Sequence, residues 1–391
     1  MGSCGSLRIG DVVAAPLNIL HIYRAPVGGL FRHVLDLARA QIERGHRVGM
    51  VADSLTGGST ADAILRELEP SLALGLTRVP MRRHIGPGDL PAFIHVTRRL
   101  AETKADVAHG HGAKGGAFAR MALGSRRALR AYTPHGGSLL YTHDTLSGRF
   151  YLASERLLMR RGDLFLFESA YSAEIFRLKV GIPEGLVRIV HNGVTRAEFA
   201  PVATAPDATD LVFIGELRPV KGVDILIDAI AQLNRAGRNI SATLVGDGPS
   251  RDVLKAQVGR LGLSSLVRFT GAMPARRAQT LGRIMVIPSL AESLPYVVLE
   301  AAAAGIPLIT TKVGGIPEIY GPLSDRLVTP KDPSALAAAI AQTLDRPDAT
   351  AALAAELRER VAQSFSVDSM VEGVLAAYRD GLDNLHRSGR R

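Results

Sequence analysis

Apolar and polar positions along the chain predict a repeated strand–helix pattern. Residues 17–23 (LNILHIY) are almost wholly apolar, as expected for a strand buried on both faces of a parallel sheet. A Gly-Gly turn follows, and then apolar residues at helical spacing from 30 to 42. Gly45 is expected to end this helix, and 47–53 (RVGMVAD) to form the next buried strand. These segments predict one βαβ unit.

The same alternation continues to residue 195 and starts again after an interruption. Further strands are predicted in the first half at 76–80, 105–109, 130–134, 164–167 and 187–190. Prolines and small polar residues then break the periodicity, which is typical of a linker. In the second half we predict strands at 210–215, 240–248, 267–271, 283–289 and 307–311, helices at 223–237 and 251–262, and two or three helices from 334 onward. The pattern predicts an α/β fold with two doubly wound parallel-sheet domains.

The length of 391 residues agrees with two domains, because single cores stop growing at about 250–300 residues. We predict an N-terminal domain over 1–195, a linker over 196–209, a C-terminal domain over 210–365 and a final segment over 366–391. The hydrophobic content of 47% and charged content of 21% are typical of a globular chain. No apolar run reaches the roughly 18 residues of a spanning helix, so we expect a cytoplasmic protein.

The net charge of +10 is concentrated in the first half of the chain. Residues 1–195 contain 25 Lys and Arg against 16 Asp and Glu, whereas 196–391 contain 22 against 21. The basic segments include 82–83, 98–99, 120–130 and 160–161. Such faces attract anionic lipid, so peripheral binding at the inner face of the plasma membrane is one prediction, and an ordinary solubilising surface is the alternative. Aromatic residues form only 5% and no recognition motif appears, so no nucleic-acid partner is expected.

Two carboxylates stand in the otherwise almost wholly apolar segment 291–307 (AESLPYVVLEAAAAGIP). Glu292 is predicted to lie in a loop after a strand, and Glu300 inside the helix that Pro295 begins. Ligands of open α/β sheets bind beyond the carboxyl ends of the strands, and a helix N-terminus offers free amides to an anion. We therefore predict a nucleotide sugar here, with its diphosphate at the helix start, Glu300 at the ribose and Glu292 facing the sugar. The alternative is that both glutamates are ordinary solvated residues.

A second turn with nearby cations occurs in 213–222 (FIGELRPVKG). Gly215 ends a predicted strand, and Arg218 and Lys221 precede a helix, where they would neutralise a departing diphosphate. Their alternative interpretation is as surface charges. Gly314-Gly315 begins a third glycine-flanked helix that would let the backbone approach a ligand closely.

Three segments place a histidine beside a glycine after a predicted strand: HGHG (109–112), TPHGG (133–137) and VHNGV (190–194). His135 is predicted to hydrogen-bond the substrate, and His109 and His111 to contact the acceptor. For each histidine, packing or capping is the alternative. No third ligand is evident beside His109 and His111, and D-x-D is absent from the sequence, so no metal site is predicted.

Together these segments resemble glycosyltransferase family 4, the retaining enzymes of the GT-B fold, and most closely its bacterial polysaccharide-assembly members. The most specific element is E-x7-E, here ESLPYVVLE, followed at the usual distance by GIPLITTKVGGIPE. The resemblance runs from Gly28-Gly29 to the final helices. It implies two Rossmann-like domains facing a cleft, with the donor held mainly by the second and the acceptor by the first. It also implies that the last helix, about 366–385, crosses back onto the first domain.

Carried over by position, the resemblance implies that Lys221 contacts the diphosphate, Glu300 the ribose, and His135 and Glu292 the sugar, while Gly29 allows close approach. The predicted catalytic residues are His135, Lys221 and Glu292. The predicted donor-binding residues are Gly28, Gly29, Gly215, Arg218, Lys221, Glu292, Leu294, Tyr296 and Glu300. His109 and His111 are the predicted acceptor-binding residues, and no cofactor is expected.

Two positions depart from the family pattern. Glu216 replaces the Arg that commonly follows the turn glycine, which leaves Arg218 with a less certain role than Lys221. The usual E-[GS]-F-G is replaced by residues 292–295, in which Pro295 has no N–H to donate. Fewer backbone amides can then reach the donor, which leaves the sugar preference open.

The expected activity is transfer of a hexose from a UDP- or GDP-hexose to a saccharide acceptor, lipid-linked in our prediction, with retention at the anomeric carbon. The expected setting is assembly of bacterial exopolysaccharide, capsule or lipopolysaccharide, without a metal at the leaving group. A sugar-nucleotide epimerase of the same fold is one alternative, and it would turn over without an acceptor. A non-catalytic sugar-nucleotide-binding protein is another, although the absence of Trp from the sequence weakens it.

Overall fold

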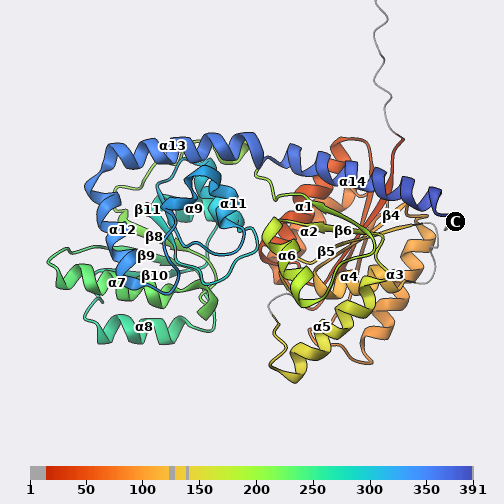
Figure 1. Cartoon of the computed structure of the whole chain (residues 1–391), viewed down its shortest axis with the longest axis horizontal. Helices are drawn as coiled ribbons and strands as arrows, with labels where there is room; N and C mark the ends of the chain where they lie inside the picture. The colour runs from red at the N-terminus through yellow and green to blue at the C-terminus, as the bar shows by residue number, and fades with distance from the viewer. Residues whose placement is uncertain (1–14, 123–127, 138–140, 390–391) are drawn as a thin grey trace, which may run out of the picture.

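The chain folds into two all-parallel sheets, and the computed structural model describes residues 15–122, 128–137 and 141–389 (Figure 1). The seven-stranded sheet has the order β3-β2-β1-β4-β5-β6-β7 and the five-stranded sheet the order β10-β9-β8-β11-β12. The first contains β1 Asn18–Tyr23, β2 Arg47–Asp53, β3 Leu76–Val79, β4 Val107–His111, β5 Leu129–Thr133, β6 Leu164–Phe167 and β7 Leu186–Ile189. The second contains β8 Thr209–Ile214, β9 Ala242–Val245, β10 Val267–Gly271, β11 Gly282–Ile287 and β12 Leu308–Thr310. The predicted fold class is confirmed.

Helices connect the strands and cover both sheets (Figure 1). Those of the first half are α1 Gly28–Glu43, α2 Gly58–Leu68, α3 Asp89–Glu102, α4 Gly112–Met121, α5 Leu146–Met159 and α6 Ala170–Lys179. Those of the second half are α7 Val223–Arg235, α8 Arg251–Arg260, α9 Ala275–Ala278, α10 Tyr296–Ala303, α11 Ile316–Tyr320, α12 Pro333–Asp345, α13 Pro347–Ser364 and α14 Val367–Arg387. Short 3-10 turns include η3 Arg196–Phe199 and η4 Pro219–Lys221.

The last two helices run across the molecule, with α13 over the second sheet and α14 over the first (Figure 1). Buried side chains of α14, including Val371 and Tyr378, share one hydrophobic cluster with Ile19 of β1 and Leu129 of β5. Burying this face stabilises the crossing by removing apolar area from water. The domain boundaries that we expected at 195, 210 and 365 stay predictions.

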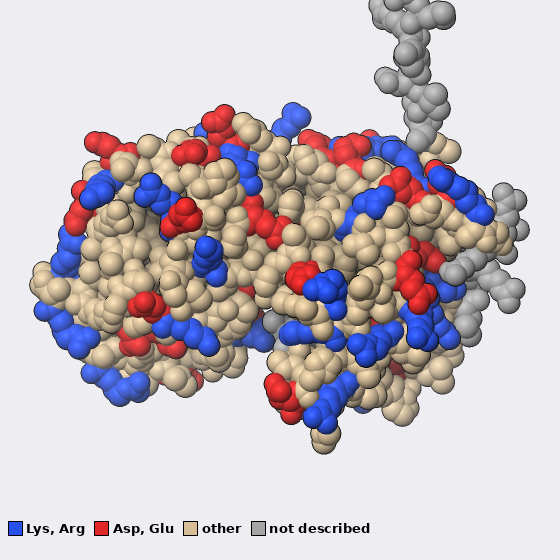
Figure 2. Space-filling view, in the orientation of Figure 1, with Lys and Arg blue, Asp and Glu red and all other residues tan. Residues whose placement is uncertain are grey.

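Among the described residues, no helix is both long enough and apolar enough to span a membrane. Lys and Arg side chains gather over the α3–α5 part of the first half, interspersed with acidic ones (Figure 2). Arg120, within one predicted basic segment, is instead fully buried and paired with Glu155, so it contributes nothing to a surface. Residues 126 and 127 of the same segment lie outside the described residues.

Candidate active site

An open cleft with about 1380 Å³ of empty space is lined by residues from both halves of the chain. Its predicted donor-binding and catalytic residues are Gly28, Gly29, His135, Gly215, Arg218, Lys221, Glu292, Leu294, Tyr296 and Glu300. Its other lining residues include Arg32, Glu168 and Asn192, none of which we predicted. The cleft therefore brings together residues more than 250 positions apart.

The glycine turn of the first half opens directly onto this cleft. Helix α1 begins at Gly28, whose φ of +63° favours glycine. A Cβ at Gly29 would lie 3.5 Å from the Tyr296 ring, an ordinary van der Waals contact. The start of α1 thus lies against the start of α10, whose N-cap residue is the extended Pro295. Helix α10 begins one residue later than predicted.

Lys221 and Glu292 form the central ion pair of the cleft. Lys221 Nζ lies 2.6 Å from Glu292 Oε1, and Ser289 Oγ donates to the same oxygen at 2.7 Å. Arg218 has a longer contact, 3.5 Å, with Glu216 on the exposed side of the turn. Lys221 is therefore held in place, whereas Arg218 is exposed and makes only a long ion pair with Glu216.

The backbone of Glu292 is closely packed against Gly314. Gly314 has a φ of +58°, and a Cβ there would lie only 1.7 Å from the Glu292 carbonyl oxygen. Only glycine fits this position without moving the loop that carries Glu292.

Replacing Gly314 with alanine should therefore lower both stability and activity. We expect a loss of about 1–3 kcal/mol in the free energy of unfolding, from backbone strain, and a reduced kcat/KM because Glu292 shifts. Urea unfolding and steady-state kinetics measure both. Gly259→Ala is the matched control, because Gly259 lies in α8 and a Cβ there meets nothing within 4 Å. Wild-type stability and turnover in G314A would contradict this account.

His135 is held at the cleft by a carboxylate. Its φ of +52° is unusual for a residue with a side chain, and its Nδ1 donates to Glu168 Oε1. Ser293 Oγ donates to the second Glu168 oxygen at 2.9 Å. Burial alone would raise the pKa of Glu168, but the charge and hydrogen bond of His135 outweigh it and lower this pKa to about 2. Glu168 therefore stays ionised and orients the His135 ring.

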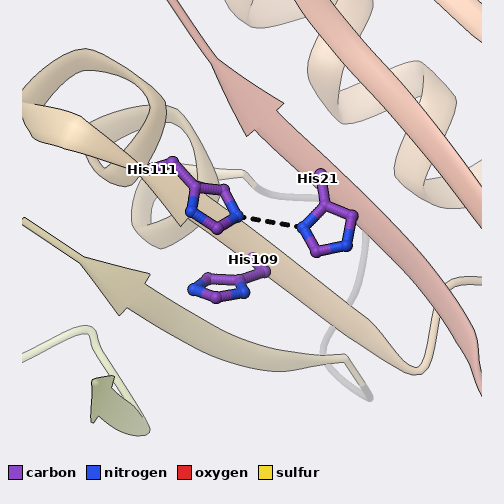
Figure 3. A group of neighbouring side chains, drawn as sticks. All are labelled: His21, His109 and His111. Carbon is purple, nitrogen blue, oxygen red and sulfur yellow. Dashed lines mark hydrogen bonds between the residues drawn. The ribbon is translucent and has the colours of Figure 1, made fainter. Parts of the chain in front are cut away.

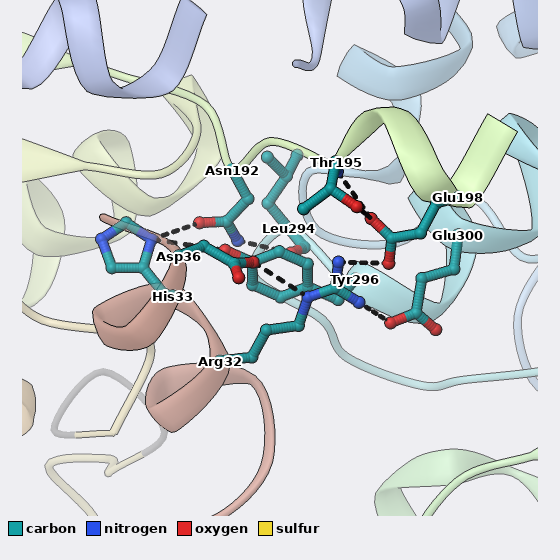
Figure 4. Close-up of polar contacts among 9 residues, drawn as sticks. All are labelled: Arg32, His33, Asp36, Asn192, Thr195, Glu198, Leu294, Tyr296 and Glu300. Atoms are coloured by element: carbon teal, nitrogen blue, oxygen red, sulfur yellow. Dashed lines mark hydrogen bonds and ion pairs between the residues drawn. The ribbon is translucent and has the colours of Figure 1, made fainter. Parts of the chain in front are cut away.

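An arginine from the first half reaches the predicted ribose site (Figure 4). Arg32 of α1 pairs with Glu300 of α10, with Glu198 of η3 and with Asp36. Its guanidinium also lies 4.6 Å from the centroid of the Tyr296 ring. Burial lowers the pKa of Arg32, but its acidic neighbours outweigh this and raise it further above its ordinary value. A ribose at Glu300 would share this carboxylate with Arg32.

Asn192 is a second bridge between the two halves (Figure 4). Its Oδ1 lies 3.0 Å from His33 Nδ1, and its Nδ2 donates to the Leu294 carbonyl oxygen at 2.9 Å. The sequence VHNGV drew attention to His191, which instead pairs with Glu318 at 3.0 Å. The asparagine beside it is the residue that reaches the cleft.

His109 and His111 lie inside the first sheet and not on the cleft surface (Figure 3). They are 0% and 1% exposed, so burial excludes the direct acceptor contact that we predicted. His109 shares hydrogen bonds with Tyr378 at 2.6 Å and Thr133 at 2.8 Å. His111 shares one with His21 at 2.9 Å, so a third imidazole, which was not evident from the sequence, lies beside this pair. Burial lowers the pKa of both His109 and His111 well below the ordinary range, which keeps the rings neutral.

Two parallel sheets that face a cleft, with a lysine, flanking glutamates and a helix start lining it, have the architecture of GT-B sugar-transferring enzymes. The comparison with known families agrees with this class. Residues 27–198 match the model described as Glycosyltransferase Family 4, and residues 208–346 match Glycosyl transferases group 1. The chain belongs to glycosyltransferase family 4, a family of retaining enzymes that use nucleotide sugars.

One sequence relative matches part of the chain, and two solved structures agree with its fold over most of its length. A D-inositol 3-phosphate glycosyltransferase of Segniliparus rotundus is 30% identical over 249 residues, which cover 60% of this chain and only 54% of that protein. The structure of Anabaena Alr3699/HepE in complex with UDP and glucose has a TM-score of 0.77 and 22% identity, covering 93% of this chain and 100% of that one. WaaG, a glycosyltransferase involved in lipopolysaccharide biosynthesis, has a TM-score of 0.69 and 18% identity, covering 92% and 98%. The predicted GT-B fold is thereby confirmed.

Proposed function

We propose that this enzyme transfers a hexose from a UDP- or GDP-hexose to a saccharide acceptor with retention. The observation that carries the proposal is the single cleft in which Lys221, the start of α10, Glu300 and His135 line one space. The α10 amides would hold the diphosphate, Lys221 would neutralise the leaving charge, and Glu300 would accept from the ribose. The complexes of Alr3699/HepE with UDP and glucose and with UDP-glucose support UDP-glucose as the first donor to test.

The reaction we propose is a front-face substitution without a covalent intermediate. The carboxylate best placed near the diphosphate, Glu292, is already engaged by Lys221 and Ser289. Glu168 is likewise engaged by His135 and Ser293. Ion pairs and hydrogen bonds of this kind lower the nucleophilicity of a carboxylate, which favours an oxocarbenium-like transition state stabilised by fixed charges.

The acceptor site we propose is the adjoining open groove, which has about 1140 Å³ of empty space including open solvent. It meets the donor cleft at His135, Lys221 and Glu292, and it extends to Tyr171 and Lys179 of α6. A sugar bound there would present a hydroxyl at the junction of the two spaces. This site replaces the one that we predicted at His109 and His111.

We further propose a lipid-linked acceptor and peripheral binding at the inner face of the plasma membrane, in assembly of exopolysaccharide, capsule or lipopolysaccharide. Helix α5 supports this, because it exposes the large apolar side chains Leu146, Phe150 and Leu157. Arg149 and Arg156 lie on the same helix. Exposed apolar and basic side chains on one helix are typical of a surface that binds anionic lipid.

Melting temperatures with a panel of nucleotides and nucleotide sugars test the donor proposal. A ligand present at 100 times its Kd should stabilise the native protein by about 2.7 kcal/mol. We expect UDP or GDP and one of their hexose conjugates to raise the melting temperature, and transfer to require an added acceptor. Epimerised nucleotide sugar formed without acceptor would favour the epimerase, and binding without turnover the non-catalytic alternative. No shift with any nucleotide would refute the proposed function.

A further inference from the structure

Five buried or half-buried histidines form a connected cluster beneath the cleft. Two groups of three within it place one ring nitrogen of each histidine within 4.8 Å of those of the other two. One group is His21, His109 and His111, and the other is His33, His111 and His135. Of these five histidines only His135 lines the cleft, so the proposed sugar transfer leaves the rest of the cluster without a role.

The first group is fully occupied by hydrogen bonds within the protein (Figure 3). His21 shares one bond with His111 and another with Gln41, both at 2.9 Å. His109 uses both ring nitrogens, one with Tyr378 and one with Thr133. A metal ion here would have to break these bonds and leave their partners unpaired. We therefore interpret this group as a hydrogen-bonded part of the core.

The second group has a buried nitrogen without a partner. His33 is 3% exposed, its Nδ1 bonds to Asn192 Oδ1, and its Nε2 has no hydrogen-bond partner. In Figure 4 this second ring nitrogen points away from Asn192. A buried nitrogen left unpaired is costly, which suggests that it normally has a ligand.

The remaining two nitrogens of this group are already close together. His111 Nδ1 and His135 Nε2 are 3.1 Å apart and share a hydrogen bond, which an ion between them would replace with two metal–nitrogen bonds. Two imidazole nitrogens on one tetrahedral Zn²⁺, each at about 2.0–2.1 Å, are separated by about 3.3 Å. The pair therefore needs almost no movement to bind one ion, and only the His33 ring has to come closer.

The outward-facing nitrogen of each of these three rings has a hydrogen-bond partner. His33 Nδ1 faces Asn192 Oδ1, and His135 Nδ1 donates to Glu168. His111 Nε2 faces His21 Nδ1, and His21 Nε2 in turn faces Gln41 Oε1. Such partners fix the tautomer and the orientation of metal-binding histidines, and a carboxylate is one of the usual partners.

We propose that His33, His111 and His135 bind one Zn²⁺ ion beneath the sugar end of the cleft. Three imidazoles select a transition metal over Mg²⁺ or Ca²⁺, which prefer oxygen ligands. His135 lines the cleft, so the ion enters from that side and has a fourth position for water or a substrate oxygen. The ion locks the His135 ring against Glu168 and is a positioning element, not a partner of the leaving diphosphate. Because both ring nitrogens of His135 are then used, this site replaces the direct hydrogen bond to the substrate that we predicted for His135. The site differs from our sequence prediction of no metal, which rested on a missing third ligand.

Calorimetric titration of the untagged full-length protein, freed of metal by a chelator, tests this site. We expect one Zn²⁺ per chain, with affinity lowered about 10- to 100-fold in Asn192→Ala, which loses only the partner of a ligand, and by at least as much in His33→Gln, which loses a ligand. His109→Gln is the matched control, because His109 is equally buried in the same cluster but belongs only to the first group. Its Zn²⁺ affinity should stay within about threefold of wild type, since it contributes no ligand.

Three results would overturn the proposal. The first is that the wild type does not bind Zn²⁺ stoichiometrically. The second is unchanged Zn²⁺ binding in H33Q, and the third is loss of binding in H109Q with H33Q unaffected. Melting temperatures without metal show whether each variant folds. If H33Q fails to fold, the visible spectrum of the wild type with Co²⁺ decides. Intense four-coordinate absorption supports the three-histidine site, and the weak spectrum of a six-coordinate ion refutes it.

Discussion

Replacing Lys221 with alanine is expected to lower kcat for glycosyl transfer about 100- to 1000-fold while the protein stays folded. Lys221 Nζ is fixed at the cleft by Glu292, at 2.6 Å, before any donor binds. Negative charge develops on the diphosphate as the glycosidic bond breaks, so a pre-positioned cation stabilises the transition state more than the ground state. Losing one such group costs about 2.7–4 kcal/mol, and the loss falls on kcat more than on KM.

Steady-state kinetics with chromatographic detection of the released nucleotide measure this effect. Lys255→Ala is the matched control, because it removes the same side chain outside the cleft. Lys255 lies on α8, its Nζ is 5.9 Å from the Phe269 ring centroid, and it does not line the cleft. It should retain wild-type kinetics. Near-normal turnover by K221A, with a normal melting temperature, would refute the role of Lys221.

The fold could be predicted almost completely because strands buried on both faces leave a strong apolar signal. β1 has five of its six residues buried, and its predicted and observed bounds differ by one residue. β4 begins two residues later than predicted, at Val107, and the Asp106 side chain just before it accepts from the Asn18 backbone N–H at 2.8 Å. The short helices α9 and α11, of four and five residues, lack enough turns to show helical periodicity.

The candidate site could be predicted only where its chemistry is local in the sequence. Lys221 stands in a glycine-flanked turn after a strand, and Glu292 in a loop between a strand and the helix that follows Pro295; each is visible in one short stretch. Arg32 and Glu300 are 268 positions apart, and a single arginine within an amphipathic helix looks like any surface residue. The histidine cluster was missed for the same reason, since His21 and His111 meet only when β1 pairs with β4.

The buried pair of Arg120 and Glu155 is the clearest case in which sequence and structure lead to different expectations. Arg120 of α4 is 0% exposed, and its Nη2 lies 2.8 Å from Glu155 Oε2 of α5. Its Nε donates to the Gly116 carbonyl oxygen, and its guanidinium lies 3.9 Å from the Tyr132 ring centroid. Tyr132 OH donates to the other Glu155 oxygen at 2.8 Å. A residue that looked like part of a basic surface is thus central to the packing of α4 against α5.

Arg120→Ala is therefore expected to lower the free energy of unfolding by about 3–5 kcal/mol, because Glu155 would be left charged and unpaired in the interior. Urea unfolding followed by circular dichroism measures this loss. The double variant Arg120→Met, Glu155→Leu should recover most of it, since it removes both charges and keeps the volume filled. Arg98→Ala is the surface control: its side chain is 74% exposed and pairs with Glu102, so its loss should stay below about 1 kcal/mol. An equal, small loss in R120A and R98A would show that the buried pair does not hold the two helices together.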